Sequence, residues 1–181
     1  DEVDDILRRL RELVERIKKH LEDNLRELEE LVKRIHDHNK RNVEEVKKLV
    51  EEIKKIIADG RKSDKVLRDA RRLIKESKDD LDRSERKIER LVTESLKDLD
   101  DLLREAEKLI EDVKRELDKR VKSEEVRRVK EEVERLLEEV RRVVRKVKEE
   151  SKRLLEELRR SSDRVKKETE RLLEELERAV K

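Results

Sequence analysis

The stretch LVERIKKHLEDNLRELEE, residues 13–30, is the unit from which the chain is built. It is followed directly by LVKRIHDHNKRNVEEVKK, residues 31–48, so an 18-residue pattern repeats without a gap. The same length recurs in residues 73–90 and 91–108, and again in residues 136–153 and 154–171. Such a repeat makes five turns of an α-helix, so each copy turns its apolar side chains toward the same direction. The sequence therefore predicts three runs of helix.

The composition agrees with long helices. Charged residues make up 59% of the 181 residues, with one glycine, no proline, no cysteine, no methionine and no aromatic residue. Such a composition with helical periodicity is typical of long helices and coiled coils. Disorder is the competing interpretation, but disordered chains lack the apolar period that this sequence keeps from end to end. No targeting signal and no apolar run of membrane-spanning length is recognised, and the cellular location is left open.

The charge is balanced, with 54 basic and 52 acidic side chains. Nucleic acids and anionic membranes bind to one-signed patches, so we expect neither as a partner. The densest basic stretch lies beside Glu138 and Glu139 and is expected to be a solvated helix face. It comprises Arg141, Arg142, Arg145, Lys146 and Lys148.

Two breaks divide the chain into helices of about 3–58, 64–120 and 124–181. Ala58-Asp59-Gly60 ends the first helix, because its glycine suits a left-handed C-terminal residue, and Ser63 is expected to cap the second. The second break follows from phase. Leu109 and Leu136 begin repeats that are separated by about seven and a half turns, so an unbroken helix would move the apolar stripe to its opposite side. We place this break near residues 121–123, with Ser123 as the cap.

Short connections between helices require antiparallel neighbours. The predicted fold is all-α: an up-down-up, antiparallel three-helix bundle of very long, nearly straight helices in a single domain, residues 1–181. An 18-residue repeat favours little supercoiling. Residues at the same height should have numbers that sum to about 122 in the first helix pair and about 245 in the second. The apolar arc of about 140° suits a three-helix or a four-helix bundle equally well.

Twelve polar residues interrupt the apolar stripes. Polar groups in a core are costly unless they are hydrogen-bonded, so we predict buried layers that specify the register of the helices. The residues are His20, Asn24, His38, Asn39, Asn42, Ser77, Ser84, Ser95, Ser151, Ser161, Ser162 and Thr169.

The sums of residue numbers given above place these polar residues at two main heights. His38 is level with Ser84 and Ser161, whereas Asn24 is within one turn of Ser95 and Ser151, and Asn42 is within one turn of Ser77 and Thr169. Several pairs are separated by one full repeat, including His20 with His38 and Asn24 with Asn42. Asp80 and Asp98, also one repeat apart, are expected at the edge of the stripe, where they are either solvated or orient a histidine.

We find no pattern that indicates catalysis, a cofactor, a metal or a small-molecule substrate. His36 and His38 point about 160° apart on a helix, and His20 is about 27 Å from His38, so no pair of them can share a metal. A serine nucleophile would need free backbone N–H groups for an oxyanion hole, which a continuous helix does not offer. One behaviour is hypothesised: burial of His38, and more weakly of His20, would reduce stability below about pH 6.

Regular repeats, serine at the helix starts, surfaces of Glu, Lys and Arg, and core His, Asn and Ser together resemble computationally designed helical bundles with buried hydrogen-bond networks. The resemblance covers the whole chain. It implies that the function is the structure itself, as a scaffold, an oligomer or one half of a heterodimer.

Two functions remain open. The first is a stand-alone scaffold that requires no partner and whose polar layers specify helix register. The alternative is an interaction module, a homo-oligomer or part of a heterodimer with a possible pH-sensitive switch, that completes a larger bundle with a partner helix or a second copy. The first helix has the widest stripe and would offer its flank, which carries Leu7, Val14, Leu25, Val32 and Val43.

Overall fold

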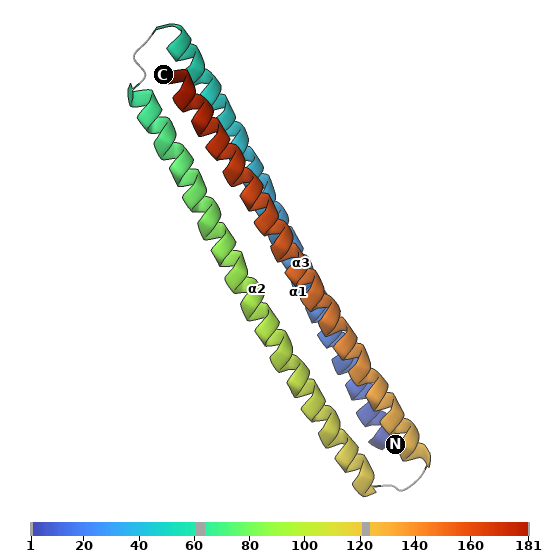
Figure 1. Cartoon of the computed structure of the whole chain (residues 1–181). Coiled ribbons are helices and arrows are strands. Elements are labelled where there is room, and N and C mark those ends of the chain that lie inside the picture. Colours follow the sequence, from blue (N-terminus) through green and yellow to red (C-terminus); the bar gives the residue numbers. More distant parts are fainter. Residues whose placement is uncertain (1, 61–63, 121–123, 181) are drawn as a thin grey trace. The chain divides into compact units, whose positions relative to one another are not determined.

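The computed structural model describes residues 2–60, 64–120 and 124–180, and it is almost entirely helical (Figure 1). The three α-helices are α1, Glu2–Ala58, α2, Asp64–Arg120, and α3, Glu124–Val180, each of 57 residues. They pack as a three-helix bundle, as predicted. The predicted helix bounds are confirmed to within one residue. The predicted caps Ser63 and Ser123 and the break at 121–123 lie outside the described residues.

The chain divides into two compact units, each made from part of every helix. Unit 1 comprises Asp1–Leu28 and Leu91–Arg153, and unit 2 comprises Glu29–Arg90 and Leu154–Lys181. The prediction of a single domain stays a prediction. Each unit has its own apolar core. In unit 1, Leu21 and Val144 are buried in one such cluster, and in unit 2 Val50 and Ile74 are buried in another.

Ion pairs in unit 1 show the register of its helices. Lys18 Nζ lies 2.6 Å from Glu139 Oε2, and Arg11 pairs with Glu132; in both pairs the numbers differ by 121, so α1 and α3 are parallel. Arg141 lies 3.2 Å from Glu107, and their numbers sum to 248, so α2 and α3 are antiparallel. This sum is within one turn of the predicted value of about 245.

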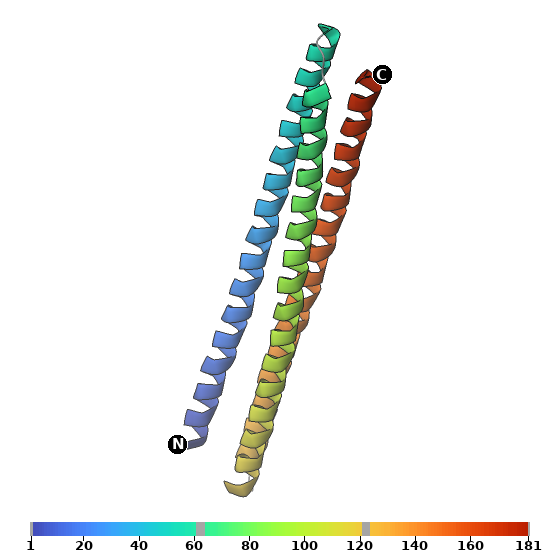
Figure 2. The ribbon, with the colours of Figure 1, turned by 90° about the vertical axis from the view of Figure 1, so that its left-hand side faces the viewer.

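Unit 2 repeats the same register. Lys47 Nζ lies 2.9 Å from Glu168 and Lys54 Nζ lies 3.4 Å from Glu175, again at a difference of 121. Across α2 and α3, Lys78 Nζ lies 3.1 Å from Glu170, and the sum is again 248. The chain direction of each helix can be followed by colour in Figures 1 and 2.

Helix α1 ends through the predicted glycine. Gly60 has φ +74°, and its N–H donates to the Ile57 carbonyl at 3.0 Å, while the Asp59 N–H donates to the Lys55 carbonyl at 3.0 Å. These bonds satisfy carbonyls that the helix end would otherwise leave without partners. A Cβ at residue 60 would meet nothing within 4 Å, so the requirement for glycine is one of backbone conformation alone.

We therefore predict that Gly60→Ala lowers the free energy of unfolding by about 1–2 kcal/mol, because an L-residue is disfavoured at positive φ. Gly60→Asn is the matched control and should cost less, since asparagine tolerates the left-handed region better. Urea denaturation followed by circular dichroism measures both. Equal stability of Gly60→Ala and the parent chain would contradict this prediction.

Candidate functional site

Ion pairs join α3 to the other two helices in each unit. Among the described residues, ion pairs cross from α1 to α3 and from α2 to α3, and we find none between α1 and α2. We call the side of each unit formed by α1 and α2 the α1–α2 face. In unit 1 it carries His20 and Asn24 of α1 with Leu91, Ser95 and Asp98 of α2. In unit 2 it carries the residues at the same repeat positions, which are His38 and Asn42 with Leu73, Ser77 and Asp80.

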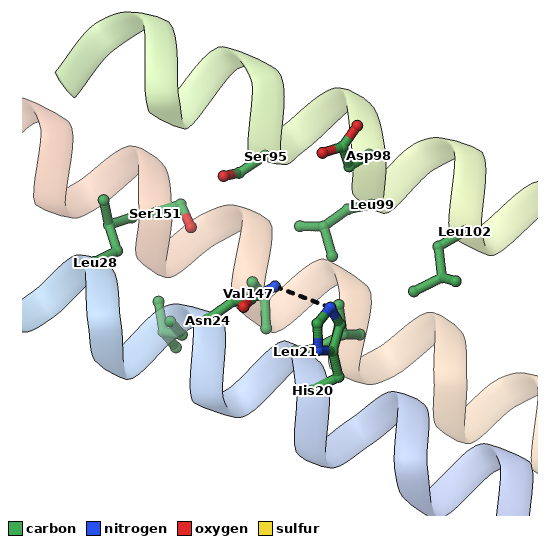
Figure 3. A pocket seen from close by; sticks show the side chains of 11 residues that line it. His20, Leu21, Asn24, Leu28, Ser95, Asp98, Leu99, Leu102, Val147 and Ser151 are labelled. Atoms are coloured by element: carbon green, nitrogen blue, oxygen red, sulfur yellow. Dashed lines mark hydrogen bonds between the residues drawn. The ribbon is translucent and has the colours of Figure 1, made fainter. Parts of the chain in front are cut away.

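The face in unit 1 contains a pocket of about 120 Å³. His20 and Asn24 reach it from α1, Ser95 and Asp98 from α2, and Ser151 from α3 (Figure 3). Its apolar lining is Leu21, Leu25, Leu28, Leu99, Leu102 and Val147. The sequence thus correctly predicted that Asn24, Ser95 and Ser151 come together at one height.

This pocket is too small for an organic ligand or cofactor. Ligand pockets usually measure about 300–1,000 Å³. A volume of about 120 Å³ corresponds to a few water molecules. Among the described residues there is also no group of three or more His, Asp or Glu side chains that could hold a metal ion. The pocket offers hydrogen-bonding groups set among leucines, which suits contact with another protein surface.

Each histidine on this face contacts the asparagine one turn later. Asn24 Nδ2 lies 3.4 Å from His20 Nε2, and Asn42 Nδ2 lies 3.3 Å from His38 Nε2. In Figure 3 the Asp98 carboxylate points away from His20, and Asp80 pairs with Arg83 at 2.6 Å. Both aspartates are exposed, so they are edge carboxylates that do not orient the histidines.

Burial divides the twelve predicted polar residues into three groups. The buried ones are Asn39, Ser151, Ser162 and Thr169. The half-buried ones are Asn42, Ser77, Ser84 and Ser161, and the exposed ones are His20, Asn24, His38 and Ser95. Among the described residues, no hydrogen bond joins two of the twelve across helices. Their role as a network that specifies register therefore stays a prediction.

The exposed positions correct the expected burial of both histidines. His20 and His38 are exposed on α1, whereas the hypothesis of acid sensitivity required them to be buried. The flank of α1 that the interaction-module alternative would offer to a partner is also covered within the chain. Leu7, Val14, Val32 and Val43 are buried, and Leu25 is half-buried against the core. The free flank of α1 is the opposite one.

His36 was not predicted to join the polar residues. Its Nδ1 lies 2.7 Å from Ser161 Oγ of α3, so it takes the partner that numbering assigned to His38. A signal in the sequence could have found it. His36 occupies the same repeat position as Lys18 and Lys54, and both lysines reach glutamates of α3.

The charges around α3 stabilise its two contacts. The hydrogen bond from Lys18 to Glu139 raises the pKa of the lysine, and that from Lys166 to Asp82 does the same for Lys166. The hydrogen bond from Lys148 lowers the pKa of the Asp100 carboxyl. Ion pairs thus border the contacts of α3 with both other helices. Among the described residues, none borders the contact between α1 and α2.

Comparison with known proteins identifies the fold. The chain has the three-helix bundle fold of a solved structure described as a computationally designed three helix bundle. The two match with a TM-score of 0.55 and 17% identity, over 99% of this chain and 89% of that one. That protein is described as a designed helical bundle, which is the broader class that the sequence resembles. No family model matches the chain, and no curated protein is significantly similar to it.

None of the three helices of this chain, over the described residues, is long and apolar enough to cross a membrane.

Asn39 supplies a first prediction for the polar residues. It is 3% exposed, its Nδ2 has no hydrogen-bond partner among the described residues, and its repeat equivalent is the buried Leu21. An unsatisfied buried amide costs about 1–3 kcal/mol. We expect Asn39→Leu to raise the free energy of unfolding by about that amount, measured by urea denaturation.

Leu21→Asn is the matched control for Asn39→Leu. It should lower stability by about 2–5 kcal/mol, because it removes buried apolar contact and adds an unpaired amide. A loss of stability in Asn39→Leu would show that the amide has a partner in solution.

Asp100 supplies a prediction on pH. Lys148→Met should raise the pKa of the Asp100 carboxyl toward its ordinary value, although Arg104 and Lys152 still lower it. Because the folded-state pKa is the lowered one, the pair stabilises the fold at neutral pH. That contribution is lost as the pH falls through the folded-state pKa. An NMR titration of the carboxyl carbon measures the shift. The exposed Lys146→Met should leave the Asp100 pKa where it is, and an equal effect of both substitutions would refute the assignment.

Proposed function

We propose that the chain is a three-helix scaffold whose α1–α2 face binds one further helix. The observation that carries this proposal is a row of three leucines on α2. Leu73, Leu91 and Leu109 are 40%, 38% and 40% exposed, although they begin successive 18-residue repeats. Single exposed leucines are common on proteins, but exposed leucines at one repeat position form an apolar line along a helix.

Helix α1 adds to this apolar line in each unit. In unit 1, Leu13 and Leu28 are half-buried. In unit 2, Leu31 and Leu49, which occupy the same repeat position as Leu13, are also half-buried. Apolar side chains that are only half covered, with hydrogen-bonding groups between them, are what a fourth helix would cover in a four-helix bundle.

The resemblance to designed bundles supports a role in structure and binding, with no catalytic step. A stand-alone scaffold is the second candidate, and one observation favours it. Each unit already has a packed core, in which residues such as Ile53 and Val133 are fully buried. Three helices are therefore sufficient for a core, and the difference between the two candidates lies in how the α1–α2 face behaves in solution.

A dye that fluoresces on apolar surfaces tests the proposal. We expect the parent chain to enhance the fluorescence and the triple variant Leu73→Gln, Leu91→Gln, Leu109→Gln to lose most of that signal. The variant should keep its helical circular dichroism, because these leucines are only partly covered. Leu81→Gln, at a buried position of α2, is the control and should lower the unfolding midpoint strongly. Dye fluorescence that the triple variant does not change would favour the stand-alone scaffold.

A further inference from the structure

On the basis of the proposed function, we propose that the occupant of the α1–α2 face is a separate amphipathic helix with Lys or Arg along the edges of its apolar stripe, and that it is not a second copy of this chain. The inference depends on the charged residues that border the face on α1 and α2.

The α2 border is mainly acidic. Seven residues are nearly two turns, so the residues seven positions after Leu73, Leu91 and Leu109 lie two turns farther along α2 and about 20° around it, on the outer side. These residues are Asp80, Asp98 and Glu116. The residues four positions before the same leucines lie on the next line outward around α2. They are Asp69, Lys87 and Glu105. All six side chains are exposed, and five of them are acidic.

The α1 border is mixed. Four residues before His20 and His38 come Arg16 and Arg34, and seven residues after them come Glu27 and Glu45. Arg9 lies one repeat before Glu27 and continues its line, and Glu52 lies one repeat after Arg34 and continues that line. All six are exposed, and they carry no net charge.

Each unit by itself has an acidic border. Unit 1 has two basic side chains, Arg9 and Arg16, against four acidic ones, for a net charge of −2. Unit 2 has Arg34 and Lys87 against four acidic ones, and its net charge is also −2. The acidic border residues are Glu27, Asp98, Glu105 and Glu116 in unit 1, and Glu45, Glu52, Asp69 and Asp80 in unit 2.

Some border residues already contact charges on their own helix. Asp69 lies 3.7 Å from Arg72, and Asp80 lies 2.6 Å from Arg83. These are exposed pairs within one turn, which contribute only a few tenths of a kcal/mol. They leave carboxylate oxygens able to accept from a further cation.

A second copy is a poor occupant on the same grounds. Two α1–α2 faces packed against each other would bring acidic borders together, and like charges oppose association. A basic helix meets the opposite sign along α2 in both units. Because the α1 border is neutral overall, the preference for basic edges holds for either direction of the bound helix.

Two synthetic peptides test the proposal. Each has about 18 residues, or one 18-residue repeat, so that it fits the α1–α2 face of a single unit, with leucine along one stripe and serine at two stripe positions to meet the His and Asn side chains. One peptide has lysine on both edges of the stripe, and the other has glutamate at the same positions. Fluorescence anisotropy measures the Kd of each for the full chain. We expect the lysine peptide to bind at least about tenfold more tightly, with a difference that shrinks as salt is added.

A charge-reversed chain is the decisive variant. Asp98→Lys, Glu105→Lys, Glu116→Lys should reverse the preference toward the glutamate peptide. Its matched control is Asp101→Lys, Glu111→Lys, Asp112→Lys, which makes the same charge change at exposed positions farther around α2 from the leucine line. The control should keep the preference for the lysine peptide. Helical circular dichroism verifies that both variants are folded.

The outcomes separate this inference from the proposed function. Equal affinity for both peptides, or the same reversal in both variants, would overturn the basic partner and leave the face as a helix-binding surface. Failure of both peptides to bind a monomeric chain would overturn both proposals. Light scattering that shows a dimer which excludes the peptides would identify a second copy as the occupant and overturn the inference.

Discussion

The structure depends on one numerical relation, that an 18-residue repeat makes five turns of an α-helix. Because of it, a residue and its equivalent in the next repeat point in the same direction, and a stripe stays in place along all 57 residues of each helix. The relation extends to the charges. Lys18 and Lys54 are two repeats apart on α1, and each pairs with a glutamate of α3 that is 121 positions later. One local pattern thus determines both the core and its charged borders.

The three helices are not equivalent, despite their common repeat. Within each unit α3 has an ion-paired contact on both sides, whereas over residues 2–60 and 64–120 no ion pair joins α1 to α2. Surface ion pairs contribute little stability individually, but they define which helix neighbours belong together. The exposed leucines lie on α2 and the exposed histidines on α1, so both belong to the two helices that no described ion pair joins to each other.

The sequence predicted the helices, their ends and their approximate register, because these follow from period, phase and the single glycine. It also predicted that Asn24, Ser95 and Ser151 lie at one height, and all three line the same pocket in unit 1. It did not predict which part of each apolar arc would be covered. An arc of about 140° suits a three-helix or a four-helix bundle equally well, and the helical wheel alone does not say which flank of the arc is the more exposed. For that reason His38 was expected to be buried, although it is exposed, and the interaction-module alternative offered to a partner the flank of Leu7, which is buried.

A perfect repeat has translational symmetry, so a helix shifted by one 18-residue repeat would still set apolar side chains against apolar ones wherever the helices overlap. Four polar residues of unit 2 break that symmetry, since their equivalents in unit 1 are apolar. Asn39, Ser84, Ser161 and Ser162 correspond to Leu21, Leu102, Val143 and Val144. Buried amides and hydroxyls tolerate few neighbours, so a slipped helix would set them against the wrong ones. The amide of Asn39 has no hydrogen-bond partner among the described residues and so costs stability, and the predicted role in register is what would offset that cost.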